Sequence, residues 1–320
     1  MSNQAFAAEP LTEHLGVRLS GLEFEKVADE PFFIDFVKKQ LAERLLVFIP
    51  GQTIDPGTAV RFASRFGPLV DIKRAGNVAH HVPGHEWIKV ISNGVASDGI
   101  AYGDGNASAQ IWHSDSTPWE APVGTIAFYC RQTPTPPPRT YFKNMIAVYA
   151  ALPAATRDRI DRVRVIHHFY PRQIEVKIAA EGPSMPLEDR KIGFAHPLVR
   201  RHLPSGRPML YLPTRRDSVV VGMDEAEGRA LLEELWDFTN RVDFEFGVGL
   251  TPDDFVIWDN SATVHRRDGW DERDTRIMWH ISLEGEVPTP MYPSRTVNTI
   301  GLSADEARDL HRKAAAVSDY

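Results

Sequence analysis

Short runs of β-type residues, separated by glycine, proline and aspartate, most constrain what this chain can fold into. Runs of this length between turn residues predict strands, and the helical patterns lie mainly towards the two ends of the chain. We therefore expect a mainly β protein with helical cover, a β-sandwich or jelly roll. The runs are WIKVIS (87–92), GTIAFYC (124–130), RVRVIHHF (162–169), PMLYL (208–212), DFVIWD (254–259) and RIMWHISL (276–283).

Helix signals occur at four places in the sequence. An aspartate followed by proline is typical of a helix start, and an acidic pair three residues apart matches a capping box. No βαβ alternation and no glycine-rich phosphate loop are visible, which argues against Rossmann and P-loop folds. Helices are predicted over 32–45 (followed by a strand over 45–49), from Asp55-Pro56 to Arg65, after Asp224 and Glu227, and over about 303–317.

Composition excludes several classes of protein. The 320 residues are 42% hydrophobic and 25% charged, with a net charge of −7. This content is too apolar for a disordered chain, and the negative charge provides no broad basic surface for nucleic acid. Cys130 is the only cysteine, so an internal disulfide and a cysteine-based metal site are excluded. With no secretory signal and no membrane-spanning apolar run, we expect a cytoplasmic protein whose partner is a small molecule.

The first candidate for chemistry is the sequence IWHSDST, which places His113 and Asp115 two residues apart. In a strand, residues i and i+2 point to the same face, so an imidazole and a carboxylate could converge on one ion. By itself the pair is more typical of a surface or core contact than of a metal site.

The second candidate is a strand–turn–strand segment in which Arg276 follows His265 by eleven residues. Two histidines and one carboxylate are the ligand set of non-haem Fe(II) oxygenases. An arginine can bind the far carboxylate of a 2-oxo acid through a bidentate pair. The alternative is that His265 is a turn histidine and Arg276 a surface salt-bridge residue.

Taken in order, these motifs resemble the TauD/TfdA family of Fe(II)- and 2-oxoglutarate-dependent oxygenases. The similarity covers about residues 10–290 of what we expect to be a single domain over 1–320. The motifs that carry it are Trp112-His113-Ser114-Asp115, Thr140, Trp258-Asp259-Asn260 before His265, Arg276, and the flanking segments 45–69, 141–153 and 196–212.

The resemblance implies a double-stranded β-helix, or jelly-roll, core and an iron enzyme. His113, Asp115 and His265 would bind Fe(II), and Thr140 and Arg276 would hold the distal carboxylate of 2-oxoglutarate. Dioxygen would be the oxidant, and hydroxylation of a C–H bond would release succinate and CO₂. Asp115 argues against the related halogenases, which have a small residue there. Desaturation and epoxidation remain open, and the resemblance suggests a homo-oligomer, a dimer or tetramer.

The chain departs from the better-known members at His280, where they carry a second arginine that binds the substrate's anionic group. His280 could contact an anion when protonated, or could simply pack in the sandwich. Arg215 and Arg216 could bind an anionic substrate or belong to a solvated face. Further substrate candidates, from the segment before and just after His113, are Tyr102, Asn106 and Trp119.

Other residues favour structural interpretations. The adjacent pairs His80-His81 and His167-His168 do not chelate readily, because neighbouring strand residues point to opposite faces. Trp258, Trp270 and Trp279 are expected to pack the core or to cover the metal site. Two alternative functions remain: a non-catalytic jelly-roll binding protein that has kept the metal site, and a zinc hydrolase, which would not need Arg276.

Overall fold

The structure, a computed structural model, describes residues 6–71, 80–95, 101–103, 105–168, 190–191 and 193–292. The helix predicted over 303–317 lies outside these residues. The described chain is mainly β with helices, as expected from the sequence. Among the described residues, no helix is long and apolar enough to cross a membrane.

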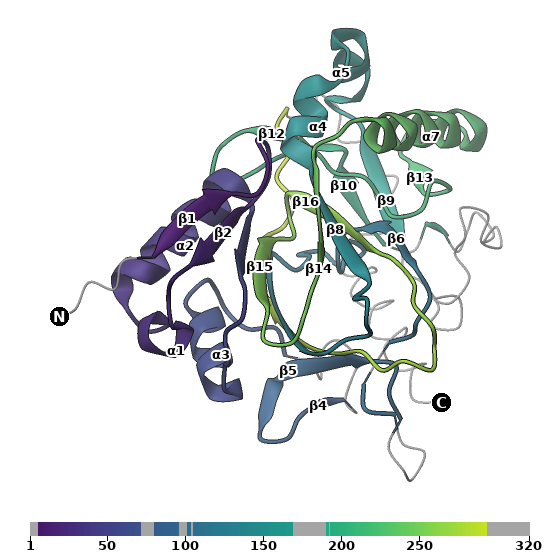
Figure 1. The fold of residues 1–320 in the computed structure, drawn as a ribbon. Coiled ribbons are helices and arrows are strands. Elements are labelled where there is room, and N and C mark those ends of the chain that lie inside the picture. The colour runs from purple at the N-terminus through teal and green to yellow at the C-terminus, as the bar shows by residue number, and fades with distance from the viewer. Residues whose placement is uncertain are drawn as a thin grey trace. The chain divides into compact units, whose positions relative to one another are not determined.

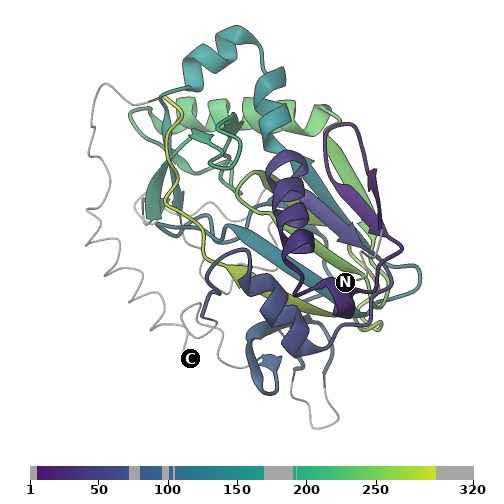
Figure 2. The same ribbon diagram turned by 90° about the vertical axis from the view of Figure 1, so that its left-hand side faces the viewer.

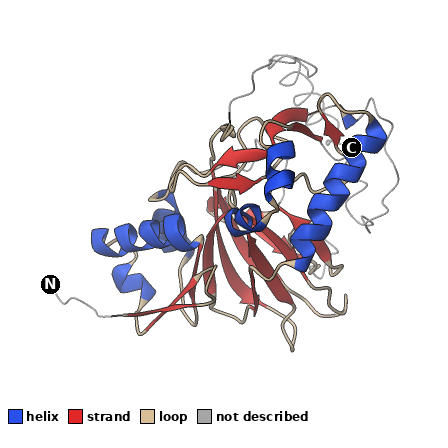
Figure 3. Cartoon of the chain, turned by 90° about the horizontal axis from the view of Figure 1, so that it is seen from above, coloured by secondary structure: helices blue, strands red, loops and turns tan. Residues whose placement is uncertain are grey.

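The largest sheet has eight strands and carries most of the predicted runs (Figure 1). Figure 3 draws its strands in red, with the helices of the N-terminal part in blue against them. The strand order is β1 (Ala7–Pro10), β2 (Val17–Ser20), β3 (Leu46–Ile49), β15 (Phe255–Asp259), β7 (Thr125–Gln132), β17 (Ile277–Leu283), β5 (His85–Ser92) and β4 (His81–Val82).

Helices α1 (Phe24–Val27), α2 (Pro31–Arg44) and α3 (Pro56–Ser64) pack on one face of this sheet (Figure 2). The α3 start is the predicted one, since the Asp55 carboxylate accepts hydrogen bonds from the amides of Gly57 and Thr58. Buried phenylalanines join the layers: the Phe62 ring lies 4.8 Å from Phe24 and 5.8 Å from Phe255, between ring centroids. Burial of these large rings is the main contribution to this core.

One connection differs from the sequence-based expectation. Strands β2 and β3 are parallel, and α1 and α2 connect them, so the chain does contain a crossover of the βαβ type. The reason it escaped prediction is that β2 is only four residues long, too short to give a clear periodic signal.

A second sheet carries several of the predicted site residues. Its order is β14 (Glu245–Gly249), β8 (Arg139–Asn144), β16 (Thr263–Arg267) and β6 (Gln110–His113). In the antiparallel ladder between β16 and β8, His265 pairs with Phe142 and Arg267 pairs with Thr140. Paired residues of a ladder point to the same face, so these four side chains share one face of the sheet.

Backbone compactness divides the chain into two units. One contains 1–110, 123–144 and 245–285, and the other contains 111–122, 145–244 and 286–320. A single domain over 1–320 stays a prediction. The described elements of the second unit, apart from the end of β6, are α4 (Met145–Ala151), α5 (Ala154–Ile160), β9 (Arg164–His168), β10 (Gly193–Pro197), β11 (Val199–Arg201), β12 (Pro208–Leu210), β13 (Val219–Val220) and α7 (Glu225–Arg241).

Candidate metal and co-substrate site

His265 is held in the middle of β16 by two aromatic side chains. Its ring stacks on Phe142 at 6.1 Å and meets Trp258 edge-on at 5.4 Å, both between ring centroids. Trp258 is 2% exposed and also contacts Phe142 at 5.1 Å. These contacts restrict the rotation of the imidazole, as a preorganised ligand requires.

The W-D-N motif before His265 builds the turn that sets its register. The Asp259 carboxylate accepts hydrogen bonds from the amides of Ser261 and Ala262. Asn260 donates its side-chain amide to the carbonyl of Val123 at 2.8 Å. Because a one-residue slip would turn His265 to the other face of the strand, this turn determines where the imidazole points.

His113 and Asp115 lie close together, although not in the way expected. Strand β6 ends at His113, and Asp115 lies in the following turn, where Ser116 has a φ of 55°. His113 Nε2 lies 3.4 Å from Asp115 Oδ1. His113 Nδ1 donates to the carbonyl of Ile111 at 2.8 Å, which makes Nε2 the lone-pair nitrogen of the neutral ring.

The three predicted ligands come together. His113, Asp115 and His265 each offer one ligand atom, and these atoms lie within 4.8 Å of one another. In the described part of the chain, no other group of three or more histidine, cysteine or carboxylate side chains brings its ligand atoms close enough together to hold one metal ion. Two imidazole nitrogens and one carboxylate oxygen match the ligand set of non-haem Fe(II), so the residues fit this metal.

Arg276 lies just before β17 and is 3% exposed. Its guanidinium carbon is 5.5 Å from the Phe128 ring centroid and 5.7 Å from that of Trp270. Burial lowers its pKa to about 10, so it remains charged at neutral pH. No carboxylate of the described residues forms an ion pair with it, which is the arrangement expected of a cation that binds an external carboxylate.

Thr140, on β8, is the second residue predicted to hold the co-substrate. It is 5% exposed, and its Oγ1 is buried without a hydrogen-bond partner in the described structure. A buried hydroxyl without a partner costs about 1–3 kcal/mol, which a bound ligand oxygen can recover.

His280, on β17, lies near the same aromatic ring as Arg276, that of Phe128. Its ring lies 5.7 Å from that of Phe128 in an edge contact, and its Nδ1 is 3.3 Å from the hydroxyl of Ser282. Phe128 therefore touches both Arg276 and His280, four residues apart.

A comparison with known families decides the class of protein. The family model described as taurine catabolism dioxygenase TauD, TfdA family matches residues 7–282. The chain belongs to this family. It is therefore a 2-oxoglutarate-dependent dioxygenase, an oxidoreductase that uses Fe(II), 2-oxoglutarate and O₂, as the motifs predicted. A non-catalytic binding protein and a zinc hydrolase are not favoured.

Individual relatives of this dioxygenase agree with the family match. The chain is 29% identical over 297 residues to an (S)-phenoxypropionate/alpha-ketoglutarate-dioxygenase from Delftia acidovorans, covering 88% of this chain and 95% of the relative. A taurine dioxygenase structure from Burkholderia xenovorans aligns with a TM-score of 0.68 at 24% identity, over 88% and 92% of the two chains. The structure of AAD-2 in complex with Mn(II) and N-oxalylglycine aligns with a TM-score of 0.70 at 23% identity, over 89% and 99%.

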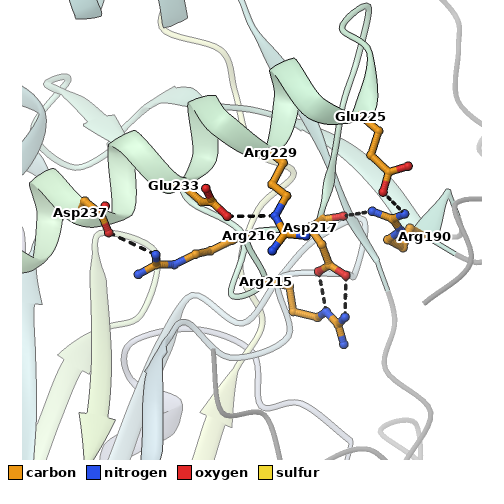
Figure 4. Close-up of polar contacts among 8 residues, drawn as sticks. All are labelled: Arg190, Arg215, Arg216, Asp217, Glu225, Arg229, Glu233 and Asp237. Atoms are coloured by element: carbon orange, nitrogen blue, oxygen red, sulfur yellow. Dashed lines mark hydrogen bonds and ion pairs between the residues drawn. The ribbon is translucent and has the colours of Figure 1, made fainter. Parts of the chain in front are cut away.

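The two arginines predicted to attract an anionic substrate to this dioxygenase are already bound to carboxylates of the protein. Arg215 is 5% exposed and forms two hydrogen bonds with Asp217, at 2.7 and 2.6 Å (Figure 4). Arg216 pairs with Asp237 of α7 at 3.1 Å. The geometry supports the structural interpretation, and a role in substrate binding stays a prediction.

Arg215 and Arg216 belong to a larger ionic network along α7. Arg190 contacts Glu225 and donates to the Asp217 carbonyl, and Arg229 pairs with Glu233 within the helix at 2.9 Å (Figure 4). Glu225, Arg229, Glu233 and Asp237 recur every four residues and so line one side of α7. This side connects the helix to the loop that contains Arg215.

The remaining substrate candidates lie in exposed or half-buried positions. Tyr102 is 51% exposed, and its amide donates to the Gly94 carbonyl at 2.8 Å. Asn106 accepts a hydrogen bond from the Ser108 amide through its side chain. The Trp119 carbonyl accepts a hydrogen bond from His196 Nε2 at 3.0 Å. These contacts explain local structure, and a role in substrate binding stays a prediction for all three.

Three buried histidines of the second unit have depressed pKa values. Burial lowers the pKa of His196 to about 3 and that of His168 to about 4, and places that of His167 well below its ordinary value. His167 stacks on Tyr211 at 4.9 Å and is 2% exposed. His167 and His168 thus lie in the core as neutral rings, which agrees with the structural interpretation given to this pair.

Sequence reasoning missed a buried cation beside the predicted ligands, Arg267. It is 6% exposed, and its guanidinium carbon lies 4.2 Å from the centroid of the Trp270 ring. Burial, reinforced by the charge of Arg276, lowers its pKa to about 9. Its position two residues after His265 in a strand was the available signal, since it places both side chains on one face.

Proposed function

We propose that this dioxygenase hydroxylates a C–H bond of a small organic acid at a metal site formed by His113, Asp115 and His265. The observation that carries the proposal is the convergence of two imidazole nitrogens and one carboxylate oxygen within 4.8 Å. This ligand set occupies one face of an octahedral ion and leaves the other positions open for a chelating co-substrate and dioxygen.

We assign the distal carboxylate of 2-oxoglutarate to Arg276 and Thr140. A buried guanidinium without an internal carboxylate and a buried hydroxyl without a partner are complementary to a carboxylate. Arginine can form two parallel hydrogen bonds to it, which orients the keto acid as well as binding it.

The iron and 2-oxoglutarate, with dioxygen, supply the oxidising power for C–H hydroxylation and release succinate and CO₂. The protein's own contribution is binding and orientation. The hydrogen bond from His113 Nδ1 to Ile111 holds one ligand ring, and Phe142 and Trp258 hold the ring of His265. The same aromatic rings limit the access of water to this side of the ligand.

For the substrate, we propose a small acid with an aromatic or other apolar body. Phe128 presents an apolar ring beside Arg276, and His280 lies against that ring, where its imidazole could donate a hydrogen bond to an anionic group. The Delftia relative is named for an aryloxyalkanoic acid, and the Burkholderia structure for a sulfonate, so both classes belong in a substrate screen. Desaturation and epoxidation would use the same residues and are a second outcome of that screen.

We further infer that the strands carrying these residues form a double-stranded β-helix. The order and antiparallel pairing of the eight-stranded and four-stranded sheets, together with the structural relatives, support it. A cytoplasmic location fits the single buried cysteine, Cys130, whose pKa burial raises to about 12. A homo-oligomer, dimer or tetramer, stays a prediction.

The test of the cofactor assignment begins without a substrate. Anaerobic addition of Fe(II) and then 2-oxoglutarate should produce the visible metal-to-ligand charge-transfer band of the chelate. Asp115→Ala, which removes one of three ligands, should lose the band and all substrate-coupled succinate formation. Full retention of both in Asp115→Ala would show that the metal is held elsewhere.

The substrate assignment needs a second experiment. Aryloxyalkanoic acids and sulfonates are offered to the aerobic enzyme, and succinate is measured against a control without substrate. His280→Ala should weaken substrate binding and leave 2-oxoglutarate binding unchanged. Equal effects on both, or no effect, would return His280 to a packing role. Binding of 2-oxoglutarate without succinate for any compound would favour a binding protein, and turnover with zinc under anaerobic conditions would favour a hydrolase.

A further inference from the structure

Arg267 and Arg266 are neighbours in β16 with opposite surroundings. Arg267 lies on the face that carries His265 and is 6% exposed. Arg266 lies over the Tyr141 ring at 3.6 Å and pairs with Asp268 at 3.1 Å. The two arginines thus differ in burial and in charge partner, although both follow His265 closely in the chain.

Arg267 is placed beside both residues assigned to the distal carboxylate of 2-oxoglutarate. In the sheet it is directly paired with Thr140, so the two side chains share one face. Its guanidinium lies 4.2 Å from the centroid of the Trp270 ring, and the Arg276 guanidinium lies 5.7 Å from the same centroid. One indole therefore contacts two buried cations.

The hydrogen bonds of Arg267 are all to neutral groups. Its Nη2 donates to the carbonyls of Ser108 at 2.8 Å and Asn106 at 3.2 Å, and its Nη1 donates to that of Asp268 at 3.0 Å. No carboxylate of the described residues forms an ion pair with it. The Asp268 carboxylate, which pairs with Arg266, attracts the charge of Arg267, but this attraction is weaker than the repulsion from Arg276.

The same contacts tie the segment after His265 to the loop before β6. The Trp270 amide donates to the Ala107 carbonyl at 3.0 Å, between the two carbonyls that Arg267 binds. A Cβ added at Gly269 would lie 3.1 Å from the Ala107 carbonyl oxygen and the Ala109 amide nitrogen, so these backbones are closely packed. Arg267 and Trp270 are therefore held firmly in place.

Two buried cations that share one ring and form no ion pair with a carboxylate of the described residues repel each other, and their burial costs free energy. A dianion beside them would offset that cost, because both charges attract its far carboxylate in a medium of low dielectric constant. We propose that Arg267 is a positioning residue of the 2-oxoglutarate site, which adds a second positive charge at the distal carboxylate and holds Arg276 in place through Trp270. This inference rests on the proposed function.

The experiment compares two keto acids on the Mn(II)-loaded, anaerobic protein by calorimetry. 2-Oxoglutarate has a distal carboxylate, and 2-oxobutanoate chelates the metal without one. Arg267→Gln should weaken 2-oxoglutarate about tenfold or more, as expected for the loss of a nearby charge in a partly buried site, and 2-oxobutanoate less than about twofold. Arg267→Lys, which keeps the charge, should retain most of the preference for 2-oxoglutarate over 2-oxobutanoate.

Arg266→Gln is the matched control, and it should change neither affinity. Trp270→Leu removes the shared ring and leaves both charges, so it should weaken 2-oxoglutarate selectively and serves as a second variant if Arg267→Gln fails to fold. Equal weakening of both keto acids, or no change in either, would overturn the inference. A wild-type protein that binds neither keto acid would instead overturn the proposed function.

Discussion

Two buried arginines of this protein, Arg276 and Arg215, have opposite electrostatic surroundings. Arg215 donates two hydrogen bonds to the carboxylate of Asp217, whereas Arg276 has aromatic rings around it and no ion pair within the described structure. Both were candidates for binding an anion on the basis of sequence. The difference teaches that burial alone does not make an arginine a ligand site; what matters is whether the protein supplies its own counter-charge.

The strongest test of this contrast is Arg276→Leu. We expect 2-oxoglutarate affinity to fall by about 100-fold or more, because losing one partner of a buried charged pair costs about 3–5 kcal/mol. The free energy of unfolding without ligand should stay the same or rise, because an apolar side chain replaces an uncompensated charge. Calorimetry and urea unfolding measure the two quantities. Unchanged affinity, or a large loss of ligand-free stability, would break the comparison.

The converse test is Asp217→Asn, which leaves Arg215 buried without its carboxylate. We expect the free energy of unfolding to fall by about 3 kcal/mol, since the Arg215 side chain is 4% exposed. Affinity for 2-oxoglutarate should not change. Replacing both residues by leucine should recover much of the lost stability, and the double-mutant cycle would measure the coupling. A change in 2-oxoglutarate affinity would mean that Arg215 also serves the site.

Lowering the pH should destabilise the folded protein at His168, which lies near Arg215. Burial lowers the pKa of His168 from 6.5 to about 4. Attraction to Asp217 opposes this shift, and repulsion from Arg215 and Arg190 adds to it. The unfolded chain binds this proton first, so stability is complete above about pH 6.5 and falls by up to about 1.4 kcal/mol per pH unit towards pH 4.

The measurement for this prediction is urea unfolding at several pH values between these limits. His168→Gln should remove the contribution of one proton to this slope, and His167 and His196, whose pKa values burial also lowers, should retain theirs. Identical slopes for wild type and variant would show that His168 does not carry this dependence.

The smallest effect is expected for Arg216→Ala. Arg216 and Asp237 are 32% and 58% exposed, and an exposed ion pair contributes about 0–1 kcal/mol and is screened by salt. Urea unfolding at low and high salt measures the contribution. A loss comparable to that of Asp217→Asn would contradict the role that we give to burial.

Local signals in the sequence were enough for many of the elements. The predicted caps are present, with the Asp55 carboxylate on the amides of Gly57 and Thr58 and that of Asp224 on the amide of Glu227. The strands that were predicted lie within a few residues of those observed, but short strands such as β1, β6 and β13 were not predicted. Capping and alternation act over a few neighbouring residues, so they can be read without knowing the fold. The parallel pairing of β2 with β3 depends on packing between distant parts of the chain, so it could not be predicted from local sequence.

The sequence also predicted the order of the site motifs, but it did not predict the geometry of the three ligands. Asp115 was expected in the strand with His113, and it lies in a turn beyond the strand end, where Ser116 has a positive φ. A strand pattern cannot show where a strand stops when the next residues are polar and small. The resemblance to the family still selected the three side chains that the structure brings together.

What the sequence by itself determined is the class of enzyme, through four motifs in a set order, and the helices and strands that local rules describe. What only the tertiary structure decided is the electrostatic state of each arginine. Arg267 binds carbonyls 161 and 159 residues away in the chain, and the Arg276 guanidinium shares an indole with it. Coulomb energy depends on distance in space and on the exclusion of water, and only the folded chain determines both.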